Sequence, residues 1–126
     1  MVSIASFTQI AGSFPGITVQ PHFEKTAFRI GKKNFATLDI PNQQARIKLS
    51  LIDQDIFIAF DHSIIFPAPG KWGKHGWTFI NLKKVPEPMF KDALKTAYRT
   101  VAPAKLSAQL KESESIKKKN AKHENL

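Results

Sequence analysis

The chain has no cysteine among its 126 residues. This absence excludes disulfide bonds, thiol nucleophiles and thiolate metal ligands, and it agrees with a reducing compartment. No apolar run approaches the roughly 18 residues that a membrane-spanning helix requires. The first residues, MVSIASFTQIAGSF, lack the positive charge and the unbroken apolar stretch of a signal peptide. We therefore expect a cytoplasmic protein that has no membrane partner.

Catalytic and metal-binding motifs are also missing from the sequence. No two histidines are spaced to share a helix face, and no cluster of His, Asp and Glu has metal-ligand spacing. Asp53 and Asp55 are better explained by the start of a helix, where negative charge is favourable. No serine lies in a nucleophile-elbow motif, and there is no glycine-rich phosphate loop. We expect a protein that is not an enzyme and that holds no cofactor or metal.

The length of the chain allows one hydrophobic core and is too short for two typical domains. We assign residues 1–110 to a single domain. We assign residues 111–126 to a basic, flexible C-terminal tail, because the apolar pattern fades there. A single small domain of this kind is expected to be a monomer.

Positive charge is the strongest compositional feature. The chain has 19 Lys+Arg against 10 Asp+Glu, a formal net charge of +9. Residues 1–102 carry +6 of this excess and residues 103–126 carry +3. Such an excess bears on the partners of a protein rather than on its fold, and nucleic acid is the natural anionic candidate.

Local patterns predict helices at both ends of the chain and strands between them. Helical spacing of apolar residues predicts a helix over 3–14, with Ser3 as N-cap, and another over 87–102. A further helix begins at Pro103. The β-branched and aromatic segments predict strands over 17–19, 26–30, 35–40, 45–51, 63–66 and 76–82. Short connections between the strands favour an antiparallel sheet with helices on one face, which is an α+β fold.

Two details of this prediction concern pairing and an ambiguous segment. Gly31-Lys32 has the composition of a tight hairpin turn, and that register places Phe28 opposite Phe35. Residues 53–60 fit either a strand or a short helix with Asp53 as N-cap, and composition does not decide between them. In the segment 45–51, Ile47 and the alternate leucines are expected to face the core.

Basic residues in three places are candidate contacts for an anionic partner. One strand presents two cations on its polar side, a hairpin tip carries two lysines, and a glycine-flanked loop places cations around a tryptophan. In that loop, Trp72 either stacks on a base beside the lysines or anchors the loop to the core. The alternative for the hairpin tip and the loop is that both are ordinary solvent-exposed turns without a ligand. The candidate nucleic-acid contacts are Lys32, Lys33, Arg46, Lys48, Lys71, Trp72, Lys74 and His75.

The last predicted strand carries two large aromatic residues on one side. If Thr78 and Ile80 face the core, Trp77 and Phe79 point the other way and require some cover. A packed C-terminal helix is one explanation. The other is a binding platform, for a ligand or for a protein partner, that these rings share with the basic strand.

Four blocks of the sequence, in this order, resemble the MmcQ/YjbR family. They are PHFEK through AFRI and GKKNFATL (residues 21–38), KL (48–49), KWGKHGW (71–77), and AYRTVAP with KL (97–106). The resemblance covers about residues 3–110 and is carried by the blocks together rather than by any single motif. It implies a YjbR-like α+β fold with an antiparallel sheet of five to six strands, an N-terminal helix and C-terminal helices. This fold is similar in outline to the secretion-chaperone-like and frataxin-like folds.

The resemblance also implies that residues 53–60 form a helix. Members of the family are commonly labelled DNA-binding, with paired hairpin wings as the proposed contacts. Here the wings would be the Gly31-Lys32-Lys33 hairpin and the loop 71–76. We therefore expect non-specific DNA binding that is mainly electrostatic. The alternatives are a protein- or peptide-interaction module that uses Trp77 and Phe79, and a domain that binds a small molecule between sheet and helix.

Overall fold

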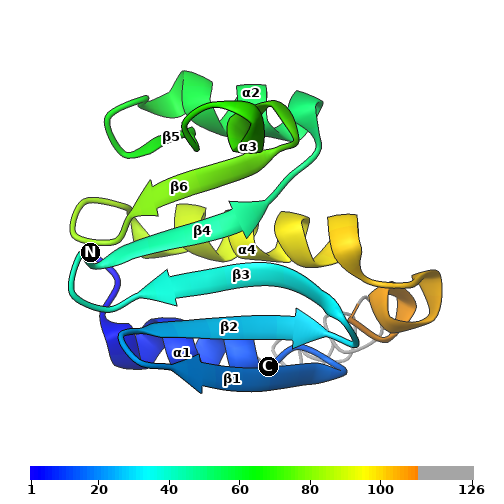
Figure 1. The fold of residues 1–126 in the computed structure, drawn as a ribbon. Helices are drawn as coiled ribbons and strands as arrows, with labels where there is room; N and C mark the ends of the chain where they lie inside the picture. Colours follow the sequence, from blue (N-terminus) through cyan, green and yellow to red (C-terminus); the bar gives the residue numbers. More distant parts are fainter. Residues whose placement is uncertain (111–126) are drawn as a thin grey trace, which may run out of the picture.

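The computed structural model describes residues 1–110, and the predicted tail (111–126) lies outside them. Six strands form one open antiparallel sheet in the order β1-β2-β3-β4-β6-β5 (Figure 1). The expected α+β fold with one antiparallel sheet is therefore confirmed. The elements are α1 (Ile4–Gly12), β1 (Ile17–His22), β2 (Lys25–Ile30), β3 (Lys33–Asp39), β4 (Gln44–Lys48), α2 (Leu51–Phe60), β5 (Ile65–Pro67), α3 (Lys71–Lys74), β6 (Trp77–Asn81) and α4 (Glu87–Val101).

Helices α1 and α4 cover one face of the sheet (Figure 1). Helix α1 begins where Ser3 Oγ accepts the N–H of Ser6 at 3.0 Å, so the expected N-cap is confirmed. Helix α4 buries an apolar stripe at helical spacing, as its sequence predicts. Residues 104–110 are also helical, in agreement with the further helix expected after Pro103. Within the described residues, no helix has the length and apolar character needed to cross a membrane.

The β2–β3 hairpin turns at Gly31-Lys32 as predicted, but the expected pairing of Phe28 with Phe35 is wrong. A β-bulge shifts the register, so Phe28 pairs with Ala36 and Phe35 is the extra residue. The bulge has a clear physical reason. It lets two consecutive residues, Phe35 and Ala36, both be fully buried, which regular alternation forbids.

The segment that follows β4 forms helix α2, as the family resemblance implies. Its N-cap is Ser50 rather than the expected Asp53: Ser50 Oγ accepts the Asp53 N–H at 3.1 Å. The helix therefore starts earlier than expected, and the strand predicted over 45–51 ends at Lys48. As a consequence Leu51, expected to face the core, is 54% exposed on the helix.

A buried aromatic cluster joins the two covering helices to the sheet. The Tyr98 ring on α4 stacks on Phe14 at 4.9 Å and meets Phe35 edge-on at 5.8 Å. The Tyr98 hydroxyl donates to the Pro15 carbonyl oxygen at 2.6 Å, across 83 positions of the sequence. Burial raises the pKa of the Tyr98 phenol above its ordinary value. This contact fixes the turn after α1 against α4.

Tyr98 is the single tyrosine of the chain, which makes its ionisation directly observable. Because the folded pKa is raised, the folded state keeps a proton that the unfolded state loses near pH 10. The stabilisation is complete below that pH and is lost as the pH rises through the folded pKa. Tyrosinate absorbance should therefore titrate at higher pH in the native protein than in urea.

The Tyr98→Phe variant provides the control. It removes the hydrogen bond to Pro15 and should lower the free energy of unfolding at neutral pH by about 1 kcal/mol. Its stability should fall less steeply with pH above pH 10 than that of the parent, as followed by urea denaturation. Equal native and unfolded titration midpoints would contradict the prediction.

Candidate nucleic-acid interface

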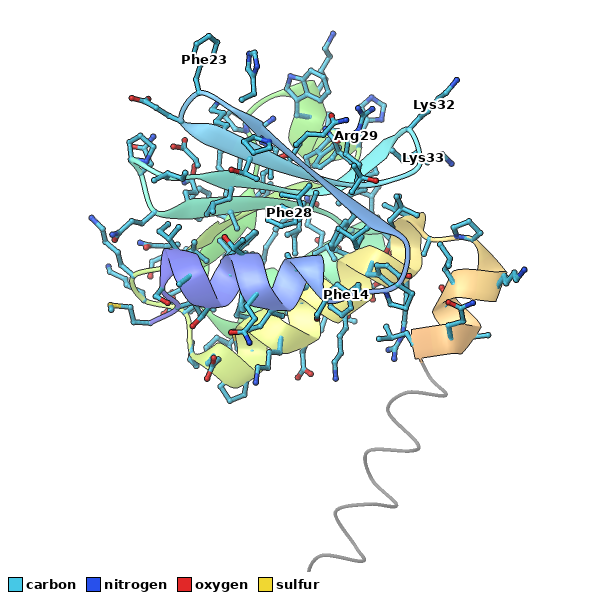
Figure 2. All side chains as sticks on the ribbon, turned by 90° about the horizontal axis from the view of Figure 1, so that it is seen from below. Phe14, Phe23, Phe28, Arg29, Lys32 and Lys33 are labelled. Atoms are coloured by element: carbon cyan, nitrogen blue, oxygen red, sulfur yellow. The ribbon has the colours of Figure 1, made fainter. Side chains whose placement is uncertain are left out.

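The face of the sheet opposite α1 and α4 holds the candidate site. Strand alternation sends Phe28 toward the helices and Arg29 to the opposite side, as Figure 2 shows. The expectation that a C-terminal helix packs over Trp77 and Phe79 is wrong, because α4 packs on the other face. We call the following side chains, which share this side by register, the open face: Lys25, Arg29, Thr37, Asp39, Arg46, Lys48, Phe66, Trp77 and Phe79.

Cations and aromatic rings lie side by side on the open face. The guanidinium carbon of Arg46 lies 5.6 Å from the centroid of the Phe79 ring, its cross-strand partner. The Lys48 Nζ lies 5.7 Å from the centroid of Trp77, again its cross-strand partner. Phe66 of the edge strand meets Phe79 edge-on at 5.6 Å. Each cation is attracted to the negative face of a ring, which orders long side chains that water would otherwise leave mobile.

Positive charge dominates the open face. Among the described strand residues on this side, Asp39 carries the single negative charge, and it lies opposite Lys25 in the register. The Asp39 carboxylate also accepts the Asn42 side-chain amide at 2.9 Å. A surface of mostly one sign raises the local concentration of ligands of the opposite sign.

The two arginines of the open face hold donor groups that the protein does not use. Arg29 donates to the Gln20 side chain at 3.1 Å and to the Lys32 carbonyl oxygen at 2.7 Å, which braces the β2–β3 tip. The Nε groups of Arg29 and Arg46 are buried and have no acceptor among the described residues, so they are closed to a ligand. The terminal N–H groups of a guanidinium are the donors that suit phosphate oxygens.

Lys48 has a structural task that sequence reasoning did not foresee. Its ammonium group donates a hydrogen bond to the His75 carbonyl oxygen. Beside it, the Leu49 N–H donates to the Gly76 carbonyl oxygen at 2.9 Å. These bonds attach the loop containing α3 to the end of β4. Lys48 therefore uses one of its three N–H donors for this attachment, and a ligand can meet only the others without loosening the loop.

The loop side chains point outward rather than into the core. Trp72 is 55% exposed, so the interpretation in which it anchors the loop is wrong. Lys71, Lys74 and His75 are exposed as well. The loop is held instead by backbone contacts and by the buried Gln54 side chain of α2, which donates to the Gly73 carbonyl at 3.1 Å. The sequence offered no signal that this glutamine is buried.

The sheet topology brings the predicted contacts to one end of the molecule. Strand β3 begins at Lys33, antiparallel β4 ends at Lys48, and β6 begins at Trp77, so these positions lie at the same end. The β2–β3 tip and the α3 loop therefore share that end. Figure 2 shows Lys32 and Lys33 there, with Phe23 at the opposite end. Arg46 lies further along the open face.

Sequence reasoning missed Lys25 and Arg29 as members of this face. The signal was present, because both residues alternate with the buried Phe28 and Ile30 along one strand. No group of three or more His, Cys, Asp or Glu in residues 1–110 is arranged to hold a metal ion.

Comparison with known proteins identifies the family. The model of the YjbR family matches residues 12–100, which is more than half of the chain. The chain belongs to the YjbR family. No curated protein matches it significantly. This YjbR-family fold resembles the crystal structure of the Deinococcus radiodurans protein DR2400, a DUF419 domain. The TM-score is 0.70 at 18% identity, over 82% of this chain and 81% of that chain.

The attachment of the α3 loop to β4 predicts a strong effect at Gly76. A Cβ on Gly76 would lie 1.8 Å from the Leu49 carbonyl oxygen, and the residue has a φ of +97°. Gly76→Ala must therefore separate the loop from the strand and should lower the free energy of unfolding by more than about 2 kcal/mol.

Gly31→Ala is the matched control for this test. Gly31 also has a positive φ, +61°, but a Cβ there would meet nothing within 4 Å. The control should lose only about 1–2 kcal/mol, the cost of the left-handed conformation alone. Equal losses in urea denaturation of the two variants would show that the close approach at Gly76 is unimportant.

Proposed function

We propose that this YjbR-family protein binds nucleic acid without sequence preference, through its phosphates, and that it acts by binding rather than by catalysis. The observation that carries the proposal is the open face, where Arg29, Arg46 and Lys25 share one uncovered side of the sheet with a single aspartate among the described strand residues. A cytoplasmic location belongs to the same proposal, and the absence of cysteine agrees with it.

The basic tips extend this surface at one end of the sheet. Lys32 and Lys33 project from the β2–β3 hairpin, and Lys71 and Lys74 flank Trp72 on the α3 loop. Lysines that neutralise phosphates release condensed counterions, and this entropy gain drives binding of any sequence. The exposed Trp72 ring can add stacking on an unpaired base.

The alternative function is a protein- or peptide-interaction module that uses Trp77 and Phe79. The observation in its favour is that neither α1 nor α4 covers these two rings. Against it, Lys48 and Arg46 already lie over the same rings. A peptide that displaced these cations would have to desolvate them, whereas an anionic ligand would meet them directly. We therefore place nucleic acid first.

The test is fluorescence anisotropy of labelled duplex and single-stranded DNA as a function of salt concentration. The logarithm of affinity should fall linearly with the logarithm of salt, at a slope of about −0.9 per phosphate contacted on duplex DNA. Arg46→Ala should reduce that slope by about one contact and weaken binding several-fold at low salt.

Lys91→Ala is the matched control for Arg46→Ala. It removes the same charge from an exposed position on α4, on the other side of the sheet. Its affinity should change less than twofold. Absence of binding at micromolar protein and low salt would refute the proposal. A partner whose binding is insensitive to salt and is lost in Trp77→Ala would instead establish the interaction module.

A further inference from the structure

Helix α2 exposes four of its large apolar side chains and buries a polar one. Ile52 is 75% exposed, Ile56 63%, Phe60 60% and Leu51 54%. The one residue of this helix that is buried is Gln54. Phe57 and Ile58, on the same side as Gln54, pack against the core, so α2 has an apolar inward face and, unlike an ordinary surface helix, a second apolar row that faces outward.

The reason for this orientation lies in the hydrogen bonds of Gln54. Its side-chain amide donates to the Gly73 carbonyl at 3.1 Å and to Thr78 Oγ1 at 3.1 Å, which fixes α2 against α3 and β6. A buried amide that lost these partners would be costly. With that side of the helix fixed inward, Ile52, Ile56 and Phe60 must face outward.

The exposed apolar residues form one continuous surface. Ile52, Ile56 and Phe60 are spaced four apart and lie in one row along the helix, with Leu51 on the neighbouring row. A fully exposed large side chain presents roughly 150–250 Å², so these four, at 54% to 75% exposure, present roughly 400–600 Å². That is about the apolar share of one partner in a standard interface of about 800 Å² per side. The area therefore suffices for a stable protein contact.

The charges on α2 and the short strand beside it limit the kinds of partner that can bind there. The helix carries Asp53 and Asp55 and neither lysine nor arginine, so nucleic acid and acidic lipid are unfavourable occupants. The neighbouring edge strand β5 has only three residues and ends at Pro67, with Pro69 close behind, which blocks the addition of a further strand. What remains is the packing of another helix on this row.

We propose that α2 is a homodimer interface, in which two copies of the chain pack α2 against α2 in antiparallel orientation about a twofold axis. A twofold contact uses the same patch on both partners, so the patch must be self-complementary. With Ile56 on the axis, Ile52 of one copy faces Phe60 of the other. Asp55 lies about 100° round the helix from Ile56 and stays at the rim, in contact with water.

The rim of this face carries one charge of each sign, which two copies related by a twofold axis could pair. Beside α2, a groove of about 380 Å³ is lined by Asp55 and by Lys74 of α3, among others. Neither of these two has an ion-pair partner among the described residues. Each is therefore available to its opposite in the other copy. The dimer replaces our expectation of a monomer. It does not depend on nucleic-acid binding by the open face, which lies on the strands, although Lys74 belongs to both proposed surfaces.

The first test is sedimentation equilibrium of the full chain, up to about 1 mM, a range that detects weak specific dimers. The parent should dimerise, and Ile56→Asp should raise the dimer dissociation constant at least tenfold. Phe23→Asp is the matched control, because Phe23 is 93% exposed on the β1–β2 turn, at the edge of the sheet opposite β5, against which α2 packs. It introduces the same charge and should leave the constant within twofold. A parent that stays monomeric, or a dimer that Ile56→Asp leaves intact, would overturn the proposal.

The second test uses the absence of native cysteine, so that one introduced thiol is unique. Ile56→Cys places both thiols at the axis and should give a disulfide-linked dimer under mild oxidation. Ile52→Cys places them about 12 Å apart along the helices, beyond the roughly 7 Å between Cα atoms that a disulfide spans. It should stay uncrosslinked. Equal crosslinking of the two variants, or none in either, would refute the antiparallel contact.

Discussion

The packing of two helices on one face of the sheet is the constraint from which the other surfaces follow. Phe7 of α1 contacts Phe28 of β2 at 5.4 Å and Phe90 of α4 at 5.3 Å between ring centroids, so one aromatic core joins all three elements. Because strand side chains alternate, every residue between two core residues points to the opposite face. Arg29 and Arg46 are therefore on the open face as a consequence of how the core is built.

The sequence predicted the fold well wherever the spacing of apolar residues matches the side chains that are buried in the structure. Regular alternation around Ile47 and Ile80 identified both the strands and the side that holds Arg46. Two other features required tertiary information. The bulge at Phe35 arises because the core accepts two consecutive side chains, and Trp72 is exposed because backbone bonds and Gln54 hold its loop. Neither the space in the core nor the hydrogen bonds of the loop can be inferred from a local sequence pattern.

Helix α2 shows the same limit more sharply. Its apolar spacing fits a helix, and the family resemblance selects the helix over the strand, yet neither tells which side faces inward. The orientation depends on Gln54, whose partners are Gly73 and Thr78 on segments that follow in the sequence. These hydrogen bonds, together with the packing of Phe57 and Ile58 on the core, leave Ile56 exposed.

The charges of the two surfaces make the proposed functions compatible. At a net charge of +9, two copies of this chain repel each other, and a dimer through the open face would bring the cations together. Contact through α2 keeps these cations apart, because α2 itself carries neither lysine nor arginine. Repulsion between the remaining cations is screened by salt over about 10 Å, whereas apolar burial is not. Dimerisation should therefore depend much less on salt concentration than nucleic-acid binding does.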